Sequence, residues 1–121
     1  MTLTADQIAI LDESKEVRIE TVGSRGAVST IIWIVVAGDE VYIRSVRGDE
    51  GRWYQRALAD PNVAIDVAGE RIAFRAVPVD DSAGIDAVTE ALRAKYRPGG
   101  SLDRMTRDEV LGTTLRLEPV S

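Results

Sequence analysis

Short stretches rich in Val and Ile, separated by glycine-containing turns, recur along most of this chain. The stretches span residues 17–21, 28–37, 41–46, 63–67, 71–77 and 113–117. Their β-branched residues favour strands, and the turns at 23–26, 38–39 and 69–70 are short enough to form hairpins. The pattern therefore predicts six short antiparallel strands, whose spacing favours a small β-barrel. The longest stretch, 28–37, is almost continuously apolar, which predicts a central strand covered on both faces.

Helical signals lie between and around these strands. Thr4 and Gln7 have the spacing of a capping box, which predicts a helix over 5–14. A short helix is expected over 52–58, and a longer one begins at Asp81 or Ser82, with the glycines after Pro98 as its end. A second capping box at 106–109 predicts another short helix. The expected class is mainly β (α+β), a six-stranded antiparallel split β-barrel with short flanking helices, in a single domain spanning 1–121.

The chain contains no His and no Cys. This excludes disulfides, Cys-based zinc and iron–sulfur sites, thiol nucleophiles and the Ser-His-Asp triad. It also removes the usual general base of enzymes. An enzyme built from this chain must therefore take its reactive group from a cofactor or rely on carboxylates, Arg and hydroxyl groups.

Fifteen basic and twenty acidic residues give a net charge of −5. A compact acidic protein is a poor general ligand for nucleic acid or for an anionic membrane, so neither is expected as a partner. The longest apolar run, 31–37, is far shorter than the roughly 20 residues that span a bilayer. The N-terminal residues have no cationic region before an apolar run, so a cytoplasmic location is expected.

Arginines gather where the third predicted strand meets the following helix. Arg44, Ser45, Arg47 and Arg52 surround a glycine-containing loop, a combination that suits a phosphate through guanidinium groups and backbone amides. The alternative is a solvated loop whose arginines pair with the acidic residues at 49–50.

Trp33 and Trp53 are the only tryptophans. An indole offers a flat cofactor ring a surface to pack against, although a Trp in a small domain is more often part of the core. The acidic pairs at 39–40 and 80–81 are interpreted as turn and cap residues, because no further oxygen ligands for a metal lie near them in the sequence.

Three segments resemble the FMN-binding split-barrel superfamily, the pyridoxamine-phosphate-oxidase-like proteins. Residues 29–34, Ser-Thr-Ile-Ile-Trp-Ile, resemble its second strand. Residues 53–61, Trp-Tyr-Gln-Arg-Ala-Leu-Ala-Asp-Pro, are similar to a Trp-Tyr-x-Asn-Leu-x-x-Asn-Pro helix, and 114–119 resemble a closing strand that ends in Leu-Glu-Pro. The likeness is nearest to the deazaflavin-dependent nitroreductase branch, or to an uncharacterised subgroup of it.

This resemblance implies a homodimer that binds a cofactor, FMN or the 8-hydroxy-5-deazaflavin coenzyme, at the subunit interface. It implies an oxidoreductase that reduces a small planar or quinone-like acceptor. Carried over by position, the cofactor-binding residues are Thr30, Ile32, Arg44, Ser45, Arg47, Arg52 and Trp53. No catalytic residue and no metal ligand is implied. The alternative is a non-catalytic split-barrel protein that holds a cofactor, another small anion or nothing.

Overall fold

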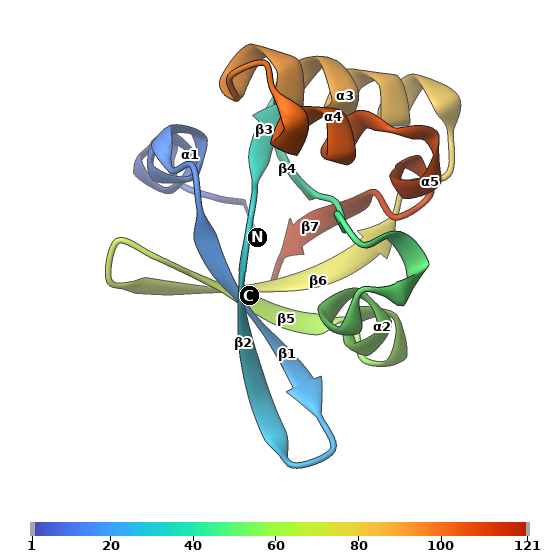
Figure 1. The fold of residues 1–121 in the computed structure, drawn as a ribbon. Helices are drawn as coiled ribbons and strands as arrows, with labels where there is room; N and C mark the ends of the chain where they lie inside the picture. Colours follow the sequence, from blue (N-terminus) through green and yellow to red (C-terminus); the bar gives the residue numbers. More distant parts are fainter. Residues whose placement is uncertain (1, 121) are drawn as a thin grey trace.

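The computed structural model describes residues 2–120 as one curled, seven-stranded antiparallel sheet with helices around it (Figure 1). The strands are β1 Val17–Gly23, β2 Gly26–Ile32, β3 Val35–Ala37, β4 Glu40–Ile43, β5 Asn62–Val67, β6 Glu70–Pro78 and β7 Leu115–Pro119. The helices are α1 Ala5–Glu13, α2 Arg52–Ala59, α3 Ser82–Lys95, α4 Gly100–Thr106 and α5 Asp108–Leu111, with a 3₁₀ turn at Gly48–Glu50. The strand order is β2-β1-β5-β6-β7-β4-β3. The predicted α+β class and split-barrel architecture are confirmed.

The strand count is seven rather than six because the predicted strand 28–37 breaks at Trp33 and Ile34. The Ile34 N–H donates to Tyr96 Oη at 3.2 Å, and the Ile34 carbonyl accepts from Lys95 Nζ at 2.6 Å. These groups are therefore occupied by the end of α3 and cannot join a neighbouring strand. The break separates β2 from β3.

The expectation of a central strand covered on both faces is wrong for β2. This strand lies at the edge of the sheet and pairs only with β1, and residues 26–31 are mostly exposed. The β1–β2 hairpin projects beyond the rest of the fold (Figure 1), so no second layer covers it.

Apolar side chains form two separate cores. The larger core fills the inside of the curled sheet and includes Ile19, Ile65 and Phe74, together with side chains from α1 and α2. The smaller core lies under α3 and α4 and is built around Val35 and Val88. Helix α3 packs on the short strand β3 at one edge of the sheet, and α4 packs against α3, so this helical layer lies to one side of the larger core.

Helix ends follow the predicted caps at two places. Thr4 Oγ1 accepts from the Gln7 N–H at 3.1 Å, and Asp81 Oδ2 accepts from the Gly84 N–H at 2.8 Å. The predicted capping box at 106–109 is wrong. Thr106 belongs to α4, an additional helix, and its hydroxyl donates to Leu102 O at 3.0 Å. None of the helices in residues 2–120 is long and apolar enough to cross a bilayer.

Candidate functional site

A cleft of about 260 Å³ lies between the barrel and the helical layer. It is lined by side chains from the end of β2, the end of β4, the first turn of α2 and one face of α4. The residues that decide its chemistry are Ile32, Trp33, Arg44, Trp53 and Arg104. Two indole rings and two guanidinium groups therefore border the same space.

Trp33 forms one wall of the cleft and stacks on Tyr96. The two ring centroids are 3.8 Å apart and the rings are within 3° of parallel. Trp53 forms part of another wall, is only 7% exposed, and meets Tyr54 edge to face at 6.2 Å. Both walls are thus fixed by a second aromatic ring behind them.

Arg44 is 2% exposed although it carries a charge. Its Nε donates to Thr114 Oγ1, its Nη1 donates to Thr89 Oγ1 and Met105 O, and its Nη2 donates to Ile85 O, all at 3.0–3.1 Å. All four acceptors are neutral, and no ion pair within residues 2–120 involves this side chain.

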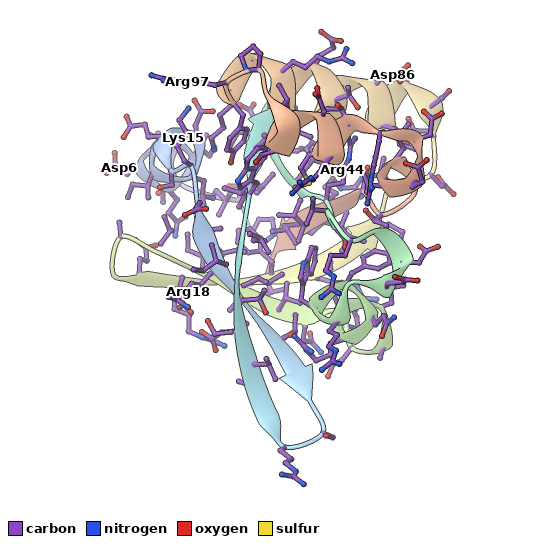
Figure 2. The ribbon with its side chains drawn as sticks, viewed as in Figure 1. Asp6, Lys15, Arg18, Arg44, Asp86 and Arg97 are labelled. Carbon is purple, nitrogen blue, oxygen red and sulfur yellow. The ribbon has the colours of Figure 1, made fainter. Side chains whose placement is uncertain are left out.

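The electrostatic consequence is a positive charge at the cleft without a carboxylate partner in the described chain. Burial lowers the pKa of Arg44 to about 10, which leaves the guanidinium charged at neutral pH. The side chain lies beneath α3 and α4 in Figure 2, whereas Asp86 and Arg97 lie at the outer surface. Arg44 joins β4 to the helical layer and lines the cleft at the same time.

Ser45 lies behind the cleft and shapes the following loop. It is fully buried, its hydroxyl donates to Gly48 O at 2.9 Å, and its N–H donates to Thr113 Oγ1 at 3.0 Å. A Cβ on Gly51 would lie 2.3 Å from Ser45 Oγ, so only glycine fits there without movement. This packing brings Trp53, two residues later, to the cleft.

Apart from Ser45, which is buried and does not line the cleft, the predicted site residues divide into two groups. Ile32, Arg44 and Trp53 line the cleft together. Thr30 is partly buried farther along β2, and Arg47 and Arg52 are exposed; none of these three lines it. Within residues 2–120, Arg47 and Arg52 form no ion pair with the acidic residues at 49–50.

Sequence reasoning missed the contribution of α4. Ser101, Arg104 and Met105 line the cleft from this helix, and Glu16 lines it from the segment before β1. The spacing of Ser101 and Arg104 is that of neighbours on one helical face, which is the signal that was available. The glycines at 99–100 predict only the end of the preceding helix, so the sequence alone indicates no helix on which these two residues would be neighbours.

The paired acidic residues act at turns and caps. Asp81 caps α3, and Asp39 lies in the turn between β3 and β4. In the described part of the chain, no three acidic side chains gather in a way that could hold a metal ion.

A family model described as "Uncharacterized protein conserved in bacteria (DUF2255)" matches residues 7–117. The chain belongs to the DUF2255 family. A search of curated proteins gives no match for this DUF2255 chain.

Solved structures share the fold of this DUF2255 protein. A conserved hypothetical protein from Mycobacterium tuberculosis has a TM-score of 0.76 at 17% identity, covering 100% of this chain and 82% of that one. A putative pyridoxamine 5′-phosphate oxidase from Listeria innocua has a TM-score of 0.70 at 14% identity, with coverages of 96% and 92%. A structure described as an F420-H2-dependent reductase has a TM-score of 0.64 at 14% identity, with coverages of 86% and 94%. These likenesses confirm the predicted split-barrel resemblance at the level of the fold.

Proposed function

We propose that this DUF2255 protein binds a flavin or deazaflavin in the cleft and acts as a reductase of a small planar acceptor. One observation carries the proposal: an aromatic side chain, Trp33, and a buried cation, Arg44, line the same cleft, and Arg44 has no carboxylate partner within residues 2–120. The names of two structures with this fold, an F420-H2-dependent reductase and a putative pyridoxamine 5′-phosphate oxidase, support the choice of cofactor class.

The apolar part of the cleft fits a planar ring. Trp33 provides a flat apolar surface for stacking, and Ile32 and Trp53 add apolar surface at the sides of the cleft. A volume of about 260 Å³ accommodates a ring system but not a whole cofactor. The side chain of the cofactor therefore leaves the cleft.

The charged part of the cleft fits an anion. Four hydrogen bonds occupy four of the five N–H groups of Arg44, and one Nη2 hydrogen has no acceptor within residues 2–120. Arg104 adds an exposed guanidinium on the same cleft. We assign the cofactor phosphate to the exposed Arg104, with the buried charge of Arg44 attracting the anionic tail from within the cleft. Arg47 and Arg52 are secondary cations on the loop between two lining residues, Val46 and Trp53.

The bound cofactor supplies the hydride transfer, so the absence of His and Cys is no obstacle. The chain's own residues bind the cofactor and orient its ring. Trp33 and Trp53 exclude water from the ring, and the guanidinium groups hold the anionic tail. A non-catalytic binding protein is the second candidate, favoured by the internal hydrogen bonds that already use most donors of Arg44 and Ser45.

We also propose that the working unit is a homodimer. Ile31 is 52% exposed, lies on the edge strand β2 and lines the cleft, and Val28 on the same strand is 38% exposed. The cleft is smaller than the roughly 300–1,000 Å³ of ordinary ligand pockets. A second copy seated on this edge would cover the apolar residues and deepen the cleft. Sedimentation equilibrium of Ile31→Glu should give a monomer, and a monomeric wild-type chain would contradict the proposal.

The binding test is a fluorescence titration of the purified protein with FMN, riboflavin and the deazaflavin coenzyme. Wild-type protein should quench FMN or the deazaflavin coenzyme with low-micromolar affinity. Arg104→Gln should weaken FMN binding by about three- to tenfold, the effect of losing an exposed charged hydrogen bond, and leave riboflavin unaffected. Arg93→Gln, which removes an exposed cation paired with Glu90 on α3, is the matched control. No quenching by either cofactor would end the proposal.

A second assay separates the reductase from the binding protein. The reduced cofactor is mixed anaerobically with a small quinone or nitroaromatic acceptor, with and without the protein. The reductase predicts protein-dependent oxidation of the cofactor. Tight binding without any acceleration would favour the non-catalytic candidate.

A further inference from the structure

We infer that Trp33 is the stacking platform for the ring in the cleft, and that Tyr96 is the positioning residue that holds it there; this rests on the proposed function. The family resemblance implies Trp53, and not Trp33, as a cofactor-binding residue. The two tryptophans differ in what supports them and in how much ring surface each leaves free.

Tyr96 is fixed in place from several sides. Its hydroxyl accepts from the Ile34 N–H at 3.2 Å and lies 2.5 Å from Lys15 O and 3.1 Å from Ile34 O, to either of which it can donate. The ammonium groups of Lys15 and Lys95 each lie 5.5 Å from the centroid of its ring. A phenol bound in this way has little freedom to tilt or slide.

Trp33 takes its orientation from Tyr96. The near-parallel stack at 3.8 Å covers one face of the indole. Trp33 also follows β2 at the point where the chain leaves the sheet, so strand pairing does not restrain it. The phenol therefore supplies the restraint, and the wall of the cleft is formed before any ligand arrives.

Trp33 also has surface left for a ligand. It is partly exposed and lines both the 260 Å³ cleft and a neighbouring open cleft shared with Lys15, Glu16, Tyr96 and Arg97. Trp53 is 7% exposed and is packed against Tyr54. Of the two indoles, Trp33 is the one that can offer a face to a ring.

A ring placed on this face makes a three-layer stack of Tyr96, Trp33 and ligand. Offset stacking of aromatic rings is worth about two- to tenfold in affinity beyond simple burial. The arrangement selects planar, conjugated ligands, because a bent or saturated ring cannot contact the whole indole.

The test is a titration with riboflavin, which carries the ring without a phosphate. Trp33→Leu should lower affinity by about two- to tenfold and abolish the red shift that stacking on indole gives the absorption of the bound ring at saturation. Trp33→Phe should recover most of the affinity. Tyr96→Leu should reproduce the loss, and Tyr96→Phe, which keeps the ring behind the indole, should reproduce less of it.

Tyr42→Leu is the matched control, because it removes a partly buried aromatic ring next to the smaller core and outside the cleft. It should keep both the affinity and the spectrum, which separates stacking from general destabilisation. If riboflavin binds and Trp33→Leu changes neither affinity nor spectrum, the inference is wrong and the proposed function stands. If neither riboflavin nor FMN nor the deazaflavin coenzyme binds, the proposed function fails, and the inference fails with it.

Discussion

Lys15 and Lys95 hold the ends of two helices against each other. Lys95 Nζ donates to Leu11 O in the last turn of α1 at 3.1 Å, and Lys15 Nζ, two residues beyond α1, donates to the carbonyl of Lys95 at the end of α3. Carbonyls in the last turn of a helix lack internal partners, and a cation there satisfies them and the helix dipole together. These are the only two lysines of the chain, which has 15 basic residues.

Lys95→Met should therefore destabilise the fold. The substitution keeps the apolar stem and removes the donor to Leu11 O and Ile34 O, at an expected cost of ~1–2 kcal/mol. Urea unfolding at pH 7 measures it. Arg93→Met on the same helix, whose cation is exposed and paired with Glu90, should change stability by less than ~0.5 kcal/mol. Equal losses in the two variants would contradict the role of Lys95.

Alkaline pH should weaken the fold through Tyr96. Burial raises the pKa of Tyr96 from 10.0 to about 12, so the stability that its neutral phenol contributes is present below pH 10 and lost as the pH rises toward 12. Lys95 acts in the opposite sense, because burial lowers its pKa from 10.5 to about 8 and stability rises between these values. Above pH 10.5 other groups also contribute, because burial raises the pKa of Tyr42 and of Tyr54 and lowers the pKa of Arg44 to about 10. The effect of Tyr96 is therefore the difference between wild type and a Tyr96 variant in that range.

Comparing the urea midpoints of wild type and Tyr96→Phe from pH 10.5 to 12 tests this account. At pH 10.5 the variant should be less stable than wild type, because it lacks the hydroxyl that bonds Ile34. Its urea midpoint should then fall less than that of wild type as the pH rises to 12. Parallel curves for the two proteins would mean that Tyr96 does not titrate with unfolding.

Gly51→Ala should be costly, although the backbone angle there suits any residue. The added Cβ would lie 2.3 Å from the buried Ser45 Oγ, and forcing an extra methyl into packed space costs ~1–3 kcal/mol. Combining it with Ser45→Gly should restore part of the loss, which thermal melts of the single and double variants would show. Gly100→Ala, where no atom lies within 4 Å of the added Cβ, should be neutral or stabilising by up to ~1 kcal/mol.

Arg44→Met should loosen the helical layer. The variant keeps the bulk of the side chain but removes the donor to the hydroxyls of Thr89 and Thr114, to the buried carbonyl of Met105 and to the partly buried carbonyl of Ile85, at an expected cost of ~2–4 kcal/mol. Relief from burying a lone charge opposes this loss, and we expect the loss of four hydrogen bonds to outweigh it. Hydrogen exchange of α3 and α4 should rise selectively. Arg25→Met, in the exposed turn between β1 and β2, serves as the control, and a variant as stable as wild type would contradict the role of Arg44.

Local sequence signals were sufficient for most of the fold. Alternation, glycine turns and the cap residues Thr4 and Asp81 act over a few positions, so they predicted the hairpins and the starts of α1 and α3. The break at Trp33 and Ile34 depends on Tyr96, 62 residues away in sequence from Ile34. No local pattern carries that information, and the ten residues 28–37 alone favour one continuous strand.

The kind of candidate site was predictable from the sequence, but only some of its residues were: Ile32, Arg44 and Trp53 line the cleft as expected. The sequence indicated arginines beside an indole, and the cleft has both. It could not show that Arg44 points inward to four neutral acceptors while Arg47 and Arg52 remain at the surface. Arg104 reaches the cleft because α4 packs against α3, which buries Leu102 and Met105 in the smaller core.

A crystal structure of the protein grown with FMN or with the deazaflavin coenzyme tests the central claim most directly. The account predicts ring density against Trp33 in the cleft, with the phosphate beside the guanidinium of Arg104. A cofactor bound elsewhere on the molecule, with the cleft between Trp33 and Arg104 empty or filled only by water, would contradict it.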